Sequence, residues 1–129
     1  MSGQHDHSYQ YVALRCVPRV DREEFVNVGV VLYCQAIDYL AVSWHCDRDR
    51  LHALDPSLDV DRVCAALEFV EGVCAGDERG GAIAGKPLSQ RFGFLKAPRS
   101  TVVQPGPVHG GVTADPAAEL GRLRTRLVD

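Results

Sequence analysis

Alternating apolar and polar residues predict three strands in the first third of the chain. Between Val26 and Cys34 every even-numbered residue is apolar, whereas the odd-numbered residues are mixed. Because successive side chains of a strand point to opposite faces, this pattern indicates a strand with one buried face. Similar alternation and short connections predict an antiparallel meander over residues 9–17, 25–35 and 39–46.

Helical spacing of apolar residues appears later in the chain. It is clearest between Asp59, a favourable N-cap, and Gly76, a favourable residue for ending a helix. A short helix is predicted at residues 87–95, and a last helix begins at Asp115 and Pro116. Two further segments are predicted as a mobile glycine-rich loop, residues 76–85, and a brief strand, residues 100–104.

These elements predict an α+β fold in which helices pack on one face of a small antiparallel sheet. The sheet would contain the three-strand meander and at least one later strand. Residues 1–8 are predicted to form a disordered N-terminal tail, and residues 9–129 a single domain. The predicted core combines one strand face with the apolar helix positions, namely Val12, Leu14, Val28, Val30, Leu32, Val42, Trp44, Val63, Leu67, Val70, Leu123 and Leu127.

Composition narrows the classes of function. The net charge of -3 over 129 residues disfavours non-specific binding to nucleic acid or to an anionic membrane. No apolar run reaches the roughly 20 residues of a membrane-spanning helix, and the first residues lack the order of a signal peptide, so we expect a cytoplasmic protein. The five cysteines lack C-x-x-C spacing and are expected to be free thiols, and we expect no metal or cofactor.

The second face of the predicted sheet is a candidate binding platform. It would carry small, aromatic and hydrogen-bonding side chains, including Asn27, Tyr33 and Tyr39, around an interior strand glycine, Gly29. Such a glycine often permits the close approach of a backbone or a ligand. The other interpretations are a solvated face and a face covered by residues 87–108.

A second candidate is the segment from Arg91 to His109, where arginines and hydroxyl groups alternate with prolines and glycines. Guanidinium groups, hydroxyls and loop N–H groups recognise carboxylates and phosphates, although ordinary surface charge has the same composition. An enzymatic version of this segment would use His109 as a general base and Ser100 as a nucleophile.

The chain resembles an uncharacterised bacterial family, domain of unknown function 3037. The resemblance rests on Tyr9-Gln10-Tyr11, on residues 15–19, 51–56 and 99–105, and on the helix start at Asp115. It implies a small cytosolic protein that is often encoded beside a HipA-like serine/threonine kinase, and therefore a protein partner. It supplies no catalytic residues.

The resulting hypothesis is a non-enzymatic protein-interaction or regulatory module, the small partner of a HipA-like kinase. The alternative is an enzyme that binds a small anionic molecule or a nucleotide phosphate through residues 91–109. In either case arginines would pair with anions, amides would hydrogen-bond and tyrosines would serve as anchors. The candidate binding residues are Arg15, Arg19, Asn27, Tyr33, Tyr39, Arg91, Arg99, Ser100, Gln104 and His109.

Overall fold

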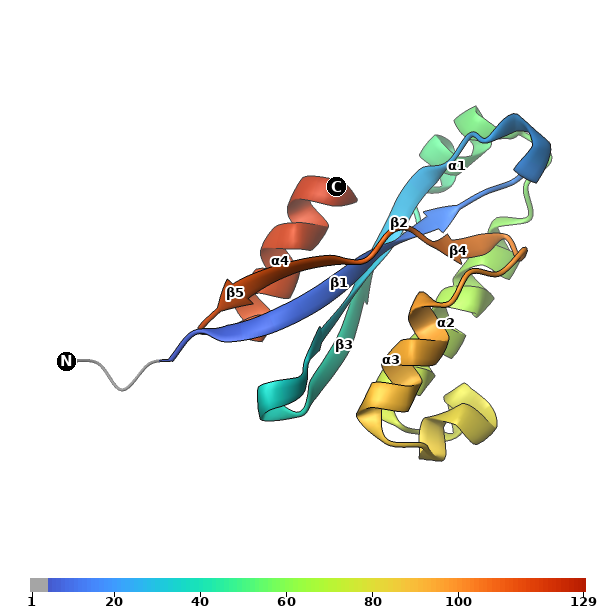
Figure 1. Ribbon diagram of the computed structural model, residues 1–129. Coiled ribbons are helices and arrows are strands. Elements are labelled where there is room, and N and C mark those ends of the chain that lie inside the picture. The colour runs from blue at the N-terminus through green and yellow to red at the C-terminus, as the bar shows by residue number, and fades with distance from the viewer. Residues whose placement is uncertain (1–4) are drawn as a thin grey trace.

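A twisted antiparallel sheet with helices on both faces forms the centre of the molecule (Figure 1). The computed structural model describes residues 5–129. In chain order its elements are β1 (His7–Cys16), η1 (Val20–Arg22), β2 (Val26–Cys34), η2 (Gln35–Ile37), β3 (Tyr39–Trp44), α1 (Arg48–Leu54), α2 (Val60–Ala75), η3 (Glu78–Gly85), α3 (Leu88–Lys96), β4 (Val103–Pro105), β5 (His109–Thr113) and α4 (Pro116–Leu127), where η denotes a 3₁₀ segment.

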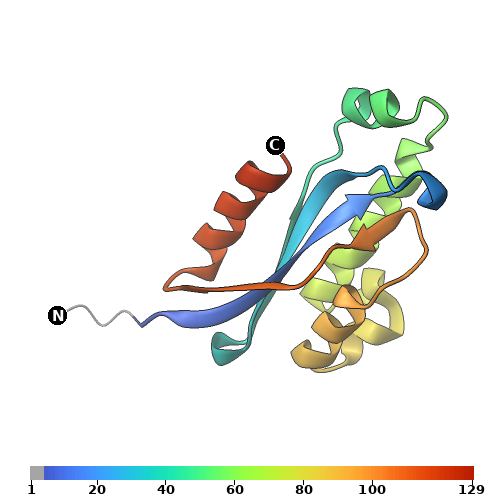
Figure 2. The same cartoon turned by 45° about the horizontal axis from the view of Figure 1, so that its top comes forward.

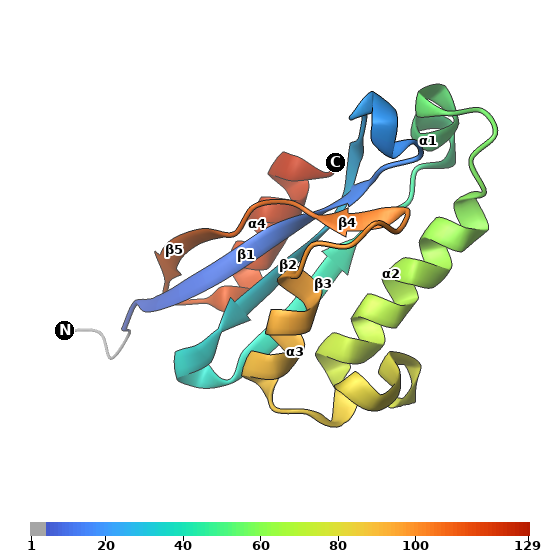
Figure 3. The ribbon, with the colours of Figure 1, turned by 45° about the vertical axis from the view of Figure 1, so that its right-hand side comes forward.

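The predicted α+β class and the antiparallel meander are confirmed. The sheet order is β3-β2-β1-β4, and β5 pairs with β1 next to β4. Both late strands lie along the same edge of β1, where β4 pairs with its C-terminal part and β5 with its N-terminal part (Figure 3). The brief strand predicted at residues 100–104 begins at Val103, and β5 was not predicted from the sequence.

Both faces of the sheet are covered, so the expectation that all helices share one face is wrong. Helices α2 and α3 lie on one face, and α4 lies on the other (Figure 2). In β2, Val31 packs towards α2, whereas Val30 and Leu32 pack with Leu120 of α4. The physical reason is that β2 carries Val31 and Tyr33 at odd positions in addition to its apolar even positions, so both of its faces can be buried.

A β-bulge changes which face the residues of β2 occupy. Leu14 of β1 pairs with Gly29, but the next residue, Arg15, pairs with Asn27, so Val28 is the extra residue. A Cβ atom at Gly29 would lie 3.0 Å from the Cβ of Trp44. Close packing against β3 therefore accounts for this glycine without a ligand.

The predicted helix ends are confirmed for α2 and α4. The Asp59 carboxylate accepts a hydrogen bond from the N–H of Arg62, and Gly76 ends α2 in the left-handed conformation. The Asp115 carboxylate accepts from the N–H of Ala118 at the start of α4. Helix α3 occupies the predicted segment, whereas the short α1 was missed.

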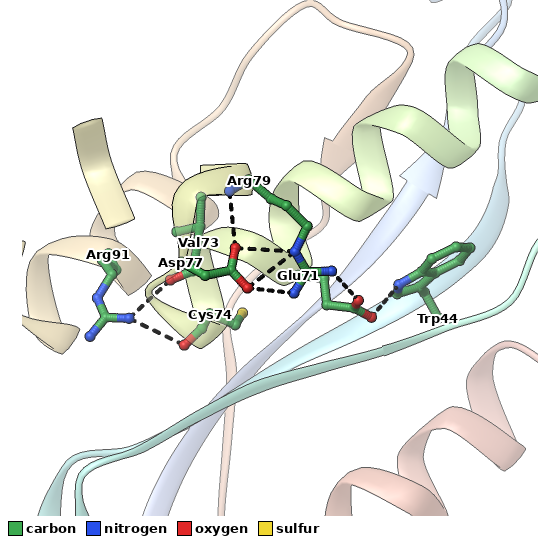
Figure 4. A network of polar contacts seen from close by, with 7 residues as sticks. All are labelled: Trp44, Glu71, Val73, Cys74, Asp77, Arg79 and Arg91. Atoms are coloured by element: carbon green, nitrogen blue, oxygen red, sulfur yellow. Dashed lines mark hydrogen bonds and ion pairs between the residues drawn. The ribbon is translucent and has the colours of Figure 1, made fainter. Parts of the chain in front are cut away.

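The segment predicted as a mobile loop, residues 76–85, contains η3, which packs directly on α2. A Cβ atom at Gly72 would lie 2.5 Å from the backbone N of Gly80, so the two backbones touch. Arg79 forms ion pairs with Asp77 and Glu71, and Glu71 accepts a hydrogen bond from the Trp44 indole (Figure 4). These contacts tie η3 to α2 and, through Glu71, to the sheet.

The first strand begins at His7, inside the segment predicted as a tail. Residues 1–4 of that predicted tail lie outside the described residues. Within residues 5–129, no helix is both long enough and apolar enough to cross a membrane.

Candidate functional site

The two tyrosines predicted as surface anchors pack against helices. Tyr33 is 8% exposed and stacks on Phe92, with 5.1 Å between the ring centroids. Tyr39 is half-buried against the cluster beneath α4, and burial raises its pKa. The structure therefore replaces the predicted open sheet face with two packed faces.

Arg91 and Arg99 bind the C-terminal carbonyl groups of helices. The Arg91 guanidinium donates to the carbonyls of Val73 and Cys74 at the end of α2, at 3.0 and 3.2 Å (Figure 4). Arg99 donates to the carbonyl of Phe94 at the end of α3. Its guanidinium also lies 4.5 Å from the centre of the Phe94 ring, and burial lowers its pKa. Both cations bind carbonyls at helix C-termini and complement the helix dipole.

Four of the predicted binding residues line three neighbouring hollows at one end of the sheet. The hollows adjoin because they share lining residues between Val17 and Val20. Arg15 and Gln104 line a hollow of 270 Å³, while Ser100 and Arg19 line adjoining ones of 640 and 120 Å³. The Arg15 guanidinium lies 4.1 Å from the centre of the Phe25 ring, and its Nε is buried without a hydrogen-bond partner among the described residues. Gln104 donates to the carbonyl of Thr101 at 2.9 Å.

Asn27 of β2 pairs with Arg15 of β1, but its side chain contacts α4. Its side-chain amide donates to the carbonyl of Leu127 at 3.1 Å. It lines a separate cleft beside the last residues of α4.

His109 lies far from Ser100. His109 pairs with Tyr11 of β1, whereas Val102, close to Ser100, accepts a hydrogen bond from Val17. Tyr11 lies within β1 and Val17 directly follows it, six residues further along, which is about 20 Å at the usual rise of a strand. The structure therefore does not assemble the base and nucleophile of the enzymatic hypothesis.

The outer edge of β5 is open. Among the described residues, β5 pairs only with β1, and its free edge carries neither a charged residue nor a proline. Val112 is 65% exposed and Val108, just before the strand, is 41% exposed. Natural proteins commonly protect such edges with charge or proline, because unpaired strand edges recruit other strands.

The two glycines of β5 leave two adjacent positions of this edge without side chains. A Cβ atom at Gly111 would lie 2.6 Å from the Tyr9 hydroxyl, so the close packing of Tyr9 requires glycine there. Tyr9 is fixed in turn by its hydrogen bond of 2.6 Å to Glu119 of α4. The glycine pair interrupts the alternation that usually indicates a strand, which is why β5 was not predicted. The valines on both sides of Gly110-Gly111, Val108 and Val112, could have indicated a strand here.

The strand at the opposite edge of the sheet, β3, has less exposed residues than β5. Every residue of β3 is buried or half-buried, because α2 covers one face of the strand and α4 the other. Of these two edge strands, β5 has the more exposed residues.

The sequence comparisons place these features in a family. A family model with the description "Protein of unknown function (DUF3037)" matches residues 11–128. The chain belongs to this family. The match confirms the resemblance seen in the sequence, while no curated protein and no solved structure gave a significant match.

The cysteines of this DUF3037 protein are free thiols in apolar surroundings. Burial raises the pKa of Cys16 to about 11, and it raises the pKa values of Cys46 and Cys74 to about 12. The thiols of Cys16, Cys46 and Cys74 are therefore protonated near neutral pH and are poor nucleophiles. Residues 5–129 contain no group of three or more histidine, cysteine or carboxylate side chains arranged to hold a metal ion.

Proposed function

We propose that this DUF3037 protein is a non-enzymatic interaction module that binds its partner by strand addition at β5. The supporting observation is the unpaired edge of β5, a strand without Asp, Glu, Lys or Arg. In strand addition, the backbone N–H and C=O groups of the edge pair with an extended segment of the partner, and side chains on both strands provide specificity.

The chemistry of the edge defines the segment that it would accept. Val112 offers an exposed apolar side chain, and Gly110 leaves space beside it. An apolar residue of the partner placed next to Val112 would bury that side chain, which favours association. We therefore propose an extended partner segment of small and apolar residues without charge at its centre.

We propose a HipA-like serine/threonine kinase as the owner of that segment, with the DUF3037 protein as its regulatory subunit in the cytoplasm. This choice rests on the gene context implied by the family resemblance. The alternative enzyme has less support, because Arg91 and Arg99 already bind helix carbonyls and Ser100 lies far from His109.

A charge placed on the edge tests the proposal. In Val112→Lys, strand addition must bury or displace an ammonium group, so we expect the dissociation constant for the purified kinase to rise at least tenfold. Val20→Lys is the matched control, because Val20 is similarly exposed, at 59%, but lies in the β1–β2 connection. Calorimetric titration measures both variants against the wild type.

The possible outcomes separate the two parts of the proposal. Equal affinity of wild type and Val112→Lys would remove β5 as the binding edge. No binding of the kinase by the wild-type protein would remove the kinase as partner. A wild-type dimer that becomes monomeric in Val112→Lys, measured by sedimentation, would instead identify a second copy of this chain as the occupant of the edge.

A further inference from the structure

One half-buried cation of the sheet has no anionic partner. Arg15 of β1 is half-buried, and its guanidinium forms no hydrogen bond or ion pair with another described residue. A charged group that loses part of its hydration is normally paired, because burial without a partner costs free energy. Arg15 is therefore a candidate for binding an anion from outside the chain.

Two neighbours hold this guanidinium in place. Its Cζ lies 4.1 Å from the centre of the Phe25 ring, which forms a cation–π contact. A Cβ atom at Gly106 would lie 3.1 Å from the same Cζ, so the absence of a side chain there leaves room for the guanidinium. The charge is thus positioned before a ligand binds, which reduces the entropy lost on binding.

The three nitrogens of the Arg15 guanidinium differ in accessibility. Nε is buried and is therefore closed to a ligand. Nη1 and Nη2 also lack a partner within residues 5–129 but are not buried, and Arg15 lines the hollow of 270 Å³. A planar carboxylate can accept hydrogen bonds from both terminal nitrogens at once, in the bidentate geometry that arginine favours. The free end of this guanidinium therefore suits a carboxylate.

The hollow around this free end combines apolar walls with one amide. Its apolar lining includes Val17, Phe25 and Pro105. The amide belongs to Gln104, whose Nε2 donates one hydrogen to the Thr101 carbonyl and keeps a second hydrogen for another acceptor. A ligand in the hollow would therefore meet apolar surface beside the hydrogen-bond donors.

Charge and size limit the ligand further. Glu23 is exposed and lines the same hollow, and no ion pair joins it to Arg15 among the described residues. Its negative charge would repel a doubly charged anion more strongly than a singly charged one. The volume of 270 Å³ is also below the roughly 300–1,000 Å³ of sites for drug-sized molecules. Both properties favour a small monoanion.

We propose that this hollow binds a small monocarboxylate with an apolar body, for which butyrate is a simple example. The carboxylate would accept from Arg15 Nη1 and Nη2, and Gln104 would donate a further hydrogen bond. The hydrocarbon part would lie against Phe25 and Pro105, where burial of apolar surface favours binding. The site is separate from the proposed partner edge, because Arg15 pairs with β4, whereas β5 pairs with the N-terminal part of β1.

Nuclear magnetic resonance measures binding at this site. Sodium butyrate, sodium acetate, butyramide or sodium phosphate is titrated into ¹⁵N-labelled protein at fixed pH and ionic strength, and the Nε–H signal of Arg15 is followed. We expect a saturable shift with butyrate. Acetate, which has a shorter hydrocarbon chain, should bind at least threefold more weakly, and butyramide, which has no charge, at least tenfold more weakly.

Each comparison can contradict one part of the proposal. No saturable shift with butyrate would overturn the site. Equal affinity for butyrate and butyramide would overturn the pairing of the carboxylate with Arg15. Equal affinity for butyrate and acetate would overturn the apolar contact, and tighter binding of phosphate than of butyrate would overturn the choice of a monocarboxylate.

Three variants locate the ligand, with the side-chain amide of Gln104 as the signal. Arg15→Lys keeps the charge but removes the planar pair of donors, so it should weaken butyrate binding at least fivefold. Arg62→Gln removes a charge from an exposed position in the adjoining hollow and should leave binding unchanged. Glu23→Gln should strengthen binding at least twofold, because it removes a repelling carboxylate. Equal affinities for Arg15→Lys and Arg62→Gln would overturn the proposal, and so would an unchanged affinity of Glu23→Gln. Backbone amide spectra of each variant check that the fold is retained.

Discussion

The Tyr9 hydroxyl joins β1 to α4 by donating to Glu119. Burial and this hydrogen bond raise the pKa of Tyr9 to about 12, while Tyr9 and Arg122 together lower the pKa of Glu119. Tyr9→Phe should therefore reduce the free energy of unfolding near pH 7 by roughly 1–2 kcal/mol. The difference from wild type should be largest between about pH 5 and pH 10.

The pH dependence follows from the direction of each pKa shift. The stabilisation from a lowered Glu119 pKa is present above its ordinary pKa and is lost as the pH falls through the folded value. The stabilisation from a raised Tyr9 pKa is present below pH 10 and is lost as the pH rises towards 12. Urea denaturation at several pH values measures this difference. Tyr11→Phe is the control, because the Tyr11 hydroxyl forms no hydrogen bond with another described residue. A difference between Tyr9→Phe and wild type that did not change with pH would contradict the interpretation.

At the same scale, arginines show how far a site can be predicted from the sequence. Residue type identified Arg91 and Arg99 as anion-binding candidates, but their partners are helix carbonyls, which no side-chain pattern reveals. Arg50 and Arg124 were not predicted to lie near each other, because they are 74 positions apart and only the tertiary fold brings them to the same cleft. Local sequence describes what a side chain can bind, whereas the tertiary fold determines what lies within its reach.

Between elements, the contact of α2 with η3 depends on two glycines. A Cβ atom at Gly72 would lie 2.5 Å from Gly80 N, and one at Gly80 would lie 2.6 Å from Val73 N. Backbone atoms cannot move aside as a flexible side chain can, so Gly72→Ala should lower the free energy of unfolding by about 2 kcal/mol or more. Gly121→Ala is the matched helical control, because its Cβ would meet nothing within 4 Å.

The two alanine variants should change stability in opposite directions. Alanine favours the helix by about 0.5–1 kcal/mol over glycine, so Gly121→Ala should stabilise the protein. Urea denaturation followed by circular dichroism compares both with wild type. A stability gain for Gly72→Ala equal to that for Gly121→Ala would show that η3 does not pack closely on α2.

Elements with local signals were predicted better than elements that depend on tertiary contacts. Asp59, Gly76 and Asp115 fix helix ends through bonds to residues close in sequence, and these ends were predicted correctly. Strand β2 was assigned one buried face because its even positions are all apolar, although Val31 and Tyr33 also indicated burial of the other face. The bulge at Val28 depends on pairing with β1, so alternation within β2 alone did not reveal it.

For the molecule as a whole, one sheet separates two apolar clusters. Adjacent residues of β2 belong to different clusters, with Val31 beneath α2 and Val30 beneath α4. Loss of packing on either face should therefore destabilise the strand that both faces share. This arrangement predicts one cooperative unfolding transition for both layers.

Leu123→Ala tests this cooperativity. Leu123 is 2% exposed and belongs to the cluster beneath α4, whereas Trp44, the only tryptophan, packs in the cluster beneath α2 and therefore reports on the opposite face. Removing a buried leucine side chain should cost about 2–4 kcal/mol. The urea midpoint from Trp44 fluorescence should fall as far as the midpoint from circular dichroism. Val112→Ala, an exposed change, should shift both midpoints little. If Leu123→Ala lowered only the circular dichroism midpoint, α4 would unfold separately and the sheet would not couple the two clusters.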